Sequence, residues 1–235
     1  MNASRTARER VRAELTREIA DTARRHLATE GAAGLSLRAV AREMGMVSSA
    51  VYRYFPSRDD LLTALIIDGY NAIGAAAEEA DSACRRDDYP ARWLAACRAL
   101  RAWALAHPHE YALVYGSPVP GYRAPEQTIG PASRVAAVLG RIISDAQAAG
   151  VLDPPGLGVA MPREFAADVG RLRESVLPGA PDDAVARALA AWAGTFGMVS
   201  FELFGQFENV VTDRDAYYDY AVTCMGRVIG LRAGA

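Results

Sequence analysis

A short run of hydroxyl-bearing and basic side chains is the part of this sequence whose chemistry is easiest to assign. Its polar members are Ser48, Ser49, Tyr52, Arg53 and Tyr54. Proteins use hydroxyl and guanidinium groups to contact DNA phosphates and base edges. Val47, Val51 and Phe55 recur every four residues, which predicts a short helix with most polar side chains off its apolar face. The run is therefore a candidate nucleic-acid contact.

A second short helix is predicted immediately before this run, because apolar side chains recur there at helical spacing. They are Leu37, Val40, Ala41 and Met44. Ser36 stands where an N-cap belongs, and Gly45 can adopt the positive φ that ends a helix. Pro56 ends the second helix. Two short helices joined by a glycine turn form the helix-turn-helix pattern.

This stretch resembles the N-terminal domain of the TetR family of transcriptional regulators. The resemblance is carried by the long predicted helix before Gly31, by Leu35-Ser36, Val40-Ala41 and Gly45, and by the run from Val51 to Leu61. It covers about residues 12–65, and a weaker resemblance over residues 192–207 is to a C-terminal helix of one branch of the family. The family usually has Ser or Thr as the cap of the second helix. This chain has Val47 there, so Ser48, one residue on, could cap the helix instead.

The resemblance implies roles for individual residues of the motif. Arg38 matches a residue that points into the major groove, where it could contact guanine, and the alternative is a phosphate contact or solvent. Ala50 could offer only an apolar contact to a base, whereas Tyr52 and Tyr54 would position the protein on phosphates. Arg58, at the start of the next helix, could meet a phosphate. The expected DNA-contacting residues are Ser36, Arg38, Ser48, Ser49, Ala50, Tyr52, Arg53, Tyr54 and Arg58.

Charge is distributed unevenly along the chain. Residues 1–58 contain 11 arginines and 6 acidic residues, for a net charge of +5. Residues 59–235 contain 15 arginines and 22 acidic residues, for a net charge of −7. A basic head on an acidic body is expected of a DNA-binding domain joined to a partner-binding domain, and the alternative is a solvated arginine-rich surface. We therefore divide the chain into domains at residues 1–58 and 59–235.

The composition favours an all-α fold with a three-helix helix-turn-helix head and a larger helical body. Of the 235 residues, 51% are hydrophobic, which allows a substantial core, and strand formers are sparse. Helices are expected at about residues 11–29, 57–80, 91–106, 110–115, 132–149, 163–177, 184–207 and 213–231, after a frayed arm at residues 1–10. No uncharged apolar run reaches the roughly 18 residues that a membrane span needs, so no membrane partner is expected.

The helix expected at residues 184–207 is apolar on nearly all sides, with a second side kept small by residues such as Gly197 and Gly205. A helix of this kind is buried on both sides. One side can face the core and the other a second copy of the chain. The sequence therefore predicts a homodimer that pairs residues 184–207 and 213–231 with their copies.

Aromatic and polar side chains of the body could line a ligand cavity. The candidates are Trp93, Cys97, Trp103, His107, Tyr111, Tyr115 and Phe165. Aromatic residues at helical spacing are more often ordinary core, and the resemblance is what implies an apolar effector pocket here. Arg101 and Glu110 are further candidates for polar anchors of a small-molecule effector of unknown identity.

Enzyme and metal chemistry find little support. The glycines are dispersed and no lysine exists to complete a phosphate loop, and His107 and His109 flank Pro108 rather than sharing a helical face. We expect no catalytic site, no cofactor and no metal site. The three cysteines, Cys84, Cys97 and Cys224, lack metal-ligand spacing. They are expected to be buried thiols of a cytoplasmic protein.

The leading hypothesis is a DNA-binding transcriptional regulator, a repressor as most such regulators are. It would act as a homodimer on a palindromic operator and be released by a small apolar ligand. The alternative is an enzyme or a small-molecule carrier built on the helical body, with a vestigial head. A third hypothesis is an architectural DNA-binding protein without an effector.

Overall fold

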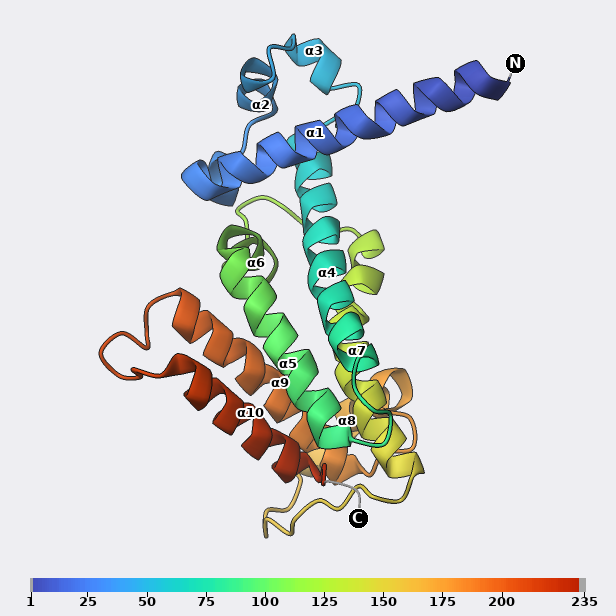
Figure 1. Ribbon diagram of the computed structural model, residues 1–235, viewed down its shortest axis with the longest axis vertical. Helices are drawn as coiled ribbons and strands as arrows, with labels where there is room; N and C mark the ends of the chain where they lie inside the picture. The colour runs from blue at the N-terminus through green and yellow to red at the C-terminus, as the bar shows by residue number, and fades with distance from the viewer. Residues whose placement is uncertain (1, 233–235) are drawn as a thin grey trace. The chain divides into compact units, whose positions relative to one another are not determined.

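A computed structural model describes residues 2–232 of the chain, with side chains from residue 8 onward. Every regular element within these residues is a helix, which confirms the all-α prediction (Figure 1). The chain forms two compact units. The first runs to Tyr70 and includes residues 107–131, and the second comprises residues 71–106 and the chain from residue 132 onward.

The first unit contains the predicted helix-turn-helix. Its elements are α1 (Asn2–Gly34), α2 (Leu37–Glu43), α3 (Ser48–Val51), the first half of α4 (Arg58–Ser82), α6 (Pro108–Tyr115) and a 3-10 helix at Glu126–Thr128. α1 is interrupted at Gly31, whose φ of 66° and ψ of 176° are not helical. The predicted frayed arm is wrong for residues 2–10, which continue α1, and Met1 lies outside the described residues.

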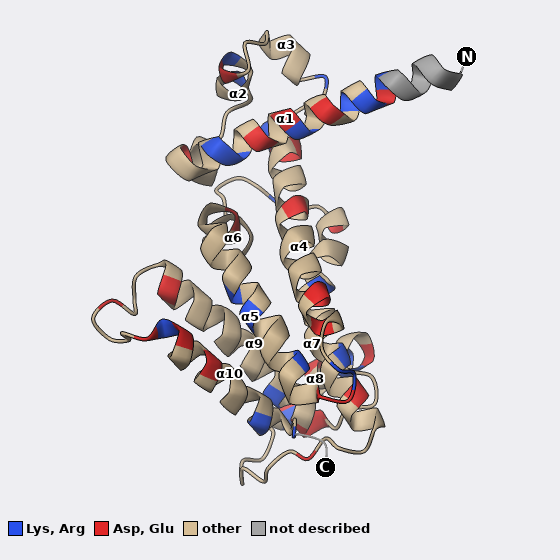
Figure 2. Cartoon of the chain, in the orientation of Figure 1, with Lys and Arg blue, Asp and Glu red and all other residues tan. Residues whose placement is uncertain are grey.

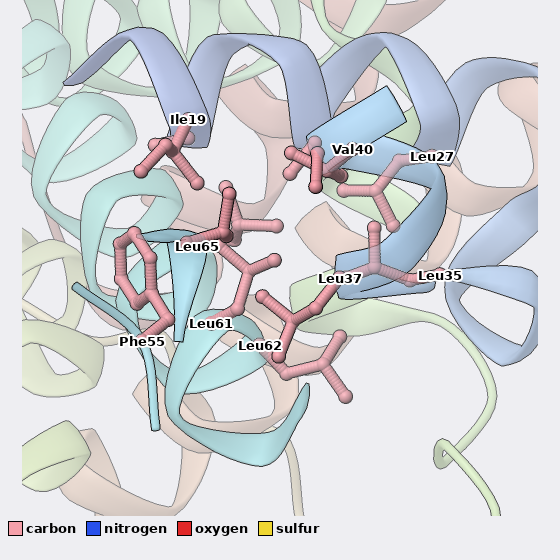
Figure 3. Close-up of a cluster of buried hydrophobic side chains, with 13 residues drawn as sticks. Ile19, Leu27, Leu35, Leu37, Val40, Phe55, Leu61, Leu62 and Leu65 are labelled. Atoms are coloured by element: carbon pink, nitrogen blue, oxygen red, sulfur yellow. The ribbon is translucent and has the colours of Figure 1, made fainter. Parts of the chain in front are cut away.

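One cluster of buried apolar side chains holds this unit together (Figure 3). Its labelled members are Ile19 and Leu27 from α1, Leu35 before α2, Leu37 and Val40 from α2, Phe55 after α3, and Leu61, Leu62 and Leu65 from α4. Burial of one such side chain stabilises a fold by about 1.5–3 kcal/mol. The cluster therefore fixes the helix-turn-helix against α1 and α4.

α6 and the loop after it pack on the same cluster. Leu113, Val119 and Tyr122 are partly buried against it. The Thr63 and Tyr122 hydroxyls lie 2.9 Å apart, within hydrogen-bond distance. Compact packing therefore groups residues 107–131 with the helix-turn-helix, whereas the division at residue 58 assigned them to the body.

Local sequence signals set the turns around α3. Gly45 has a φ of 65° at the predicted turn between α2 and α3. The N-cap of α3 is Val47, which makes no side-chain cap, so Ser48 does not replace it. At the start of α4 the Ser57 side chain caps the helix, because the Asp60 amide donates to Ser57 Oγ over 3.1 Å. The Ser57 hydroxyl in turn donates to Asp60 Oδ2 over 2.7 Å.

Ser57→Ala is expected to lower the free energy of unfolding by about 0.5–2 kcal/mol, because the first turn of α4 loses its cap. Urea denaturation followed by circular dichroism measures this change. Ser49→Ala, which removes a hydroxyl from an exposed position inside α3, is the matched control. Equal denaturation midpoints for the two variants would contradict the capping role of Ser57.

The second unit is a layered bundle around α9. Its elements are the end of α4, α5 (Tyr89–Ala106), most of α7 (Ile129–Ala148), a 3-10 helix at Arg163–Phe165, α8 (Ala166–Val176), α9 (Asp182–Leu203) and α10 (Arg214–Ile229). α9 packs against α5, α8 and α10. The Trp93 indole N–H donates to the Val222 carbonyl over 2.8 Å, and the Tyr218 hydroxyl donates to the Cys97 carbonyl over 2.9 Å. These bonds fasten α5 to α10.

α9 is shorter and more membrane-like than the sequence analysis predicted. It ends at Leu203 rather than at Phe207, because the chain turns at Gly205 with a φ of 83°. Its 22 residues include an 18-residue window with a mean hydropathy of 1.3, long and apolar enough to cross a membrane. The uncharged run within α9 is nevertheless shorter than 18 residues, as predicted, because Arg187 and Glu202 bound it. α9 packs against three neighbouring helices, so its apolar composition is also that expected of a core helix.

The cysteines differ in their environments. Cys97 is buried, Cys84 is half-buried and Cys224 is exposed, so the prediction of three buried thiols is correct only for Cys97. Burial raises the pKa of the Cys97 thiol to about 12, which keeps it protonated and unreactive at neutral pH.

A buried ion cluster joins the end of α4 to α5 and α7. The side chains of Asp81 and Arg92 are each 1% exposed, and Arg92 Nε donates to Asp81 Oδ1 over 2.7 Å. Arg86 and Arg141 each reach Asp81 Oδ2 at 3.2 Å, and Arg92 also donates to Asp145 over 2.8 Å. Burial by itself raises the pKa of Asp81, but hydrogen bonds from Arg92 and Arg86 outweigh it and hold that pKa below its ordinary value.

Candidate nucleic-acid interface and internal cavity

Most of the predicted DNA-contacting side chains lie at the surface of α2 and α3. Arg38, Ser49 and Arg53 are exposed, and Tyr52 is 40% exposed. Ser36, Ser48 and Tyr54 are half-buried. Arg38 belongs to α2, and Ser48 and Ser49 belong to α3, which packs against α2. The other four flank these helices: Ser36 is the N-cap residue of α2, and Tyr52, Arg53 and Tyr54 directly follow α3. This arrangement can present two cations, Arg38 and Arg53, and several hydroxyls to DNA.

Two members of the predicted set are placed differently. Ala50 is only 8% exposed, so its methyl group packs within the unit and is not available to a base. Arg58 donates to the carbonyls of Ala32 and Leu35 over 2.7 and 3.2 Å, and to that of Ala33 over 3.2 Å. The carbonyls of Ala32 and Ala33 belong to the end of α1, where helical backbone lacks its own donors, and that of Leu35 lies just beyond it. We therefore remove Ala50 and Arg58 from the proposed DNA contacts.

A charged cluster that the sequence analysis did not predict orients α2 against α1. Arg25 donates to Glu43 over 2.8 Å, and His26 Nε2 lies 2.7 Å from the other oxygen of the same carboxylate. The hydrogen bond from Arg25 is the main reason that the pKa of Glu43 lies below its ordinary value, and His26 adds to it. Since Glu43 is the last residue of α2, the cluster fixes the direction of the helix that carries Arg38.

Arg38→Ala is expected to weaken binding at one base pair of a DNA site by about 1–3 kcal/mol and to relax preference there. The reason is that Arg38 is exposed near the start of α2, where a bidentate contact to guanine is possible. Arg42→Ala removes the same charge from an exposed position of α2 and is the control. Anisotropy titrations against a selected site and its single-base variants measure the effect. An equal loss on selected and random DNA would contradict base reading by Arg38.

The second unit contains an apolar cavity of about 180 Å³. It is lined by Trp93 of α5, Ala136, Leu139, Gly140 and Ile143 of α7, Leu172 and Val176 of α8, Leu177, and Val185, Ala188, Leu189 and Trp192 of α9. Trp192, one of the lining residues, is 38% exposed to solvent. An all-carbon lining of this kind can hold a small apolar molecule.

Only one of the seven predicted ligand-binding residues lines this cavity, namely Trp93. Cys97 and Trp103 are buried elsewhere in the second unit, and Phe165 ends the 3-10 helix before α8. The remaining three, His107, Tyr111 and Tyr115, lie in the first unit. There the Tyr115 ring lies 5.1 Å from the tilted Tyr111 ring and makes a T-shaped contact with the Tyr70 ring at 5.6 Å, centroid to centroid.

The cavity would recognise a ligand by its shape and not by hydrogen bonds. The N–H of Trp93 is already bonded to the Val222 carbonyl, so this residue contributes its ring. The predicted anchors are engaged elsewhere. Arg101 makes ion pairs with Glu202 at 2.7 Å and Asp215 at 2.7 Å, and Glu110 lies 3.2 Å from Arg24. Among the described residues, no three His, Cys, Asp or Glu side chains are grouped so that they could hold a metal ion.

Comparisons with known proteins match both parts of the chain. A family described as "Bacterial regulatory proteins, tetR family" matches residues 19–65, and one described as "Tetracyclin repressor-like, C-terminal domain" matches residues 93–225. The HTH-type transcriptional regulator Rv1816 of Mycobacterium tuberculosis is 41% identical over 220 residues, which are 92% of this chain and 90% of that protein.

Solved structures agree with these matches. The crystal structure of the regulatory protein SCO4313 has a TM-score of 0.75 and 35% identity, and covers 92% of this chain and 97% of its own. A Rhodococcus sp. RHA1 protein of unknown function has a TM-score of 0.66 and 28% identity, and covers 92% of this chain and 93% of its own. The likeness therefore extends over both compact units.

Proposed function

The chain belongs to the TetR family of transcriptional regulators, and on that premise we propose that it is a homodimeric repressor released from a palindromic operator by a small apolar ligand. The observation that carries the ligand part is the apolar cavity of the second unit. The relatives matched over nine-tenths of the chain are named regulators, so the enzyme hypothesis is set aside. We expect the protein to act in the cytoplasm, with the DNA it binds.

Two heads are needed for useful affinity, because the short α3 of one head can contact few base pairs. Helix-turn-helix dimers place their recognition helices about 34–36 Å apart, one duplex turn, or a multiple of it. A two-fold dimer then reads two halves of a palindrome. This reasoning supports a dimer and a palindromic operator.

The surface of α9 and α10 supports the same conclusion. Exposed side chains recur at helical spacing along both helices: Ala190, Ala193, Phe201 and Phe204 on α9, and Tyr217, Tyr220, Cys224 and Val228 on α10, with Gly197 half-buried between them. We call this set the α9–α10 stripe. Figure 2 shows that the charges of α9 lie near its ends. An uncharged apolar stripe on two adjoining helices suits a four-helix interface with a second copy.

The cavity limits the ligand in size and charge. An engineered apolar cavity of roughly 150 Å³ binds benzene, which is close to the size of this one. Burying an unpaired charge costs far more free energy than burying a charge that is paired and hydrogen-bonded. The lining contains no charged residue that could pair with a charged ligand. We therefore propose an uncharged aromatic or short aliphatic ligand.

Ligand binding is expected to lower operator affinity by about 1–3 kcal/mol, the usual range of coupling between two sites. A ligand changes DNA affinity only through its preference for one conformation of the dimer. Leu189→Trp fills the cavity with a larger side chain from its own lining and should abolish the response to ligand. Leu105→Trp introduces the same side chain at an exposed position outside the cavity and is the control.

The experiment is a titration of the labelled operator complex with uncharged aromatic and aliphatic compounds, read by anisotropy. We expect release from DNA for the unmodified protein and for Leu105→Trp. A compound that releases the Leu189→Trp variant equally well acts outside this cavity and would refute the proposed site.

A further inference from the structure

The N-terminal turns of α1 carry a basic groove that the helix-turn-helix does not explain. The groove has a volume of about 430 Å³ and is lined by Arg8, Val11, Arg12 and Tyr54. α1, which carries three of these residues, continues past α3 toward the N-terminus (Figure 1). Charged residues of both signs alternate along α1, so the sign of this groove depends on which of them face it (Figure 2).

Helical periodicity places Arg8 and Arg12 on the side of α1 that packs on the rest of the unit. The buried face of α1 includes Ile19, Ala23 and Leu27, four residues apart. Residues that continue this face toward the N-terminus, at steps of three and four, are Leu15, Arg12 and Arg8. The apolar face of α1 therefore becomes a basic face where α1 extends past its neighbours.

Arg12 is held in place beside the end of the recognition segment. Its guanidinium lies 5.4 Å from the centre of the Tyr54 ring, and one of its N–H groups donates to the Arg53 carbonyl over 3.3 Å. A guanidinium has five N–H donors, so most of them stay available to another acceptor. Contacts that fix an arginine before binding reduce the entropy lost on binding.

We propose that Arg8 and Arg12 form a DNA-backbone clamp that binds phosphates beside the stretch of major groove read by α3. Guanidinium groups match phosphate oxygens in charge and geometry. Contacts of this type add affinity and set the position of the protein without reading sequence. The inference rests on the proposed DNA-binding function and adds two residues to its contact surface.

The clamp is tested by the salt dependence of binding to a fluorescein-labelled duplex of arbitrary sequence. Each phosphate contact adds about 0.9 to the slope of log affinity against log salt concentration. The double variant R8A/R12A should therefore reduce the magnitude of this slope by about 2 and weaken binding roughly tenfold or more near 0.1 M salt. Alanine favours helix more than arginine does, so α1 should stay folded.

Two further variants distinguish the clamp from a general effect of charge. R10A/R17A removes the same charge from exposed positions on the opposite side of α1 and should change the slope much less. R8K/R12K keeps both charges and should keep the slope, because the slope depends on the number of neutralised phosphates and not on the shape of the cation. Equal slopes for R8A/R12A and R10A/R17A, or loss of the slope in R8K/R12K, would overturn the clamp. Absence of salt-dependent binding by the unmodified protein would overturn the proposed DNA-binding function as well.

Discussion

Gly197→Glu is expected to produce monomers that bind operator DNA roughly 10²–10⁴-fold more weakly, because one head loses the avidity of two. Gly197 lies within the α9–α10 stripe, and a Cβ atom added there has no heavy atom from outside its own stretch of helix backbone within 4 Å. The substitution should therefore leave the protomer folded. In the dimer it places a carboxylate in an apolar helix–helix contact, where an unpaired charge is strongly unfavourable.

Light scattering and anisotropy on the same samples measure assembly and DNA affinity together. Gly170→Glu is the matched control, since Gly170 is a helical glycine of α8 where an added Cβ atom is equally free of contacts within 4 Å. It should remain dimeric and bind DNA normally. If the unmodified protein is a monomer at concentrations that saturate the operator, the interface proposed for α9 and α10 is wrong.

Asp81→Ala is expected to lower the free energy of unfolding by about 3–5 kcal/mol, the range for breaking a buried ion pair by removing one partner. The carboxylate of Asp81 accepts hydrogen bonds from Arg92, Arg86 and Arg141, and Arg92 is fully buried. Its removal leaves these guanidinium groups partly uncompensated. For a chain of this size the melting temperature should fall by roughly 6–20 °C.

The Asp81 carboxylate should also make the stability of the fold depend on pH. Because the folded-state pKa of Asp81 is depressed, its ionisation contributes stability above the unfolded-state pKa of about 4, and that contribution is lost as the pH falls through the lower folded-state value. Asp81→Ala should therefore flatten the acid side of the stability curve. Asp87→Ala, which breaks an exposed pair with Arg85, is the control and should leave both the midpoint and the acid side almost unchanged. Equal effects of the two substitutions would contradict the role of the buried cluster.

Features set by neighbouring residues were predictable from the sequence. The apolar face of α2, the turn at Gly45 and the Ser57 cap of α4 each depend on residues within one or two helical turns. The uncharged middle of α9 likewise followed from helical periodicity. Hydrophobic spacing and residues with special backbone preferences are sufficient for such elements.

Features set by distant residues were not predictable. Arg58 resembles a phosphate ligand in the sequence, but its partners are carbonyls 23 to 26 residues earlier. Trp93 bonds to a carbonyl 129 residues later, and the cavity it lines requires four helices. Periodicity identified the apolar faces of those helices but could not show where they fail to fill the space between them. Tyr111, one of the aromatic residues chosen instead, is a core residue of the other unit.

Linkage provides the most direct test of a repressor controlled through the apolar cavity. Operator affinity is measured with and without a saturating cavity ligand, and ligand affinity is measured with and without saturating operator. We predict that both affinities fall by the same factor, roughly 5–150-fold, as reciprocity requires of two coupled sites. Suppose that a ligand binds the unmodified protein but not the Leu189→Trp variant, and that it leaves operator affinity unchanged. This result would show that the cavity does not control DNA binding.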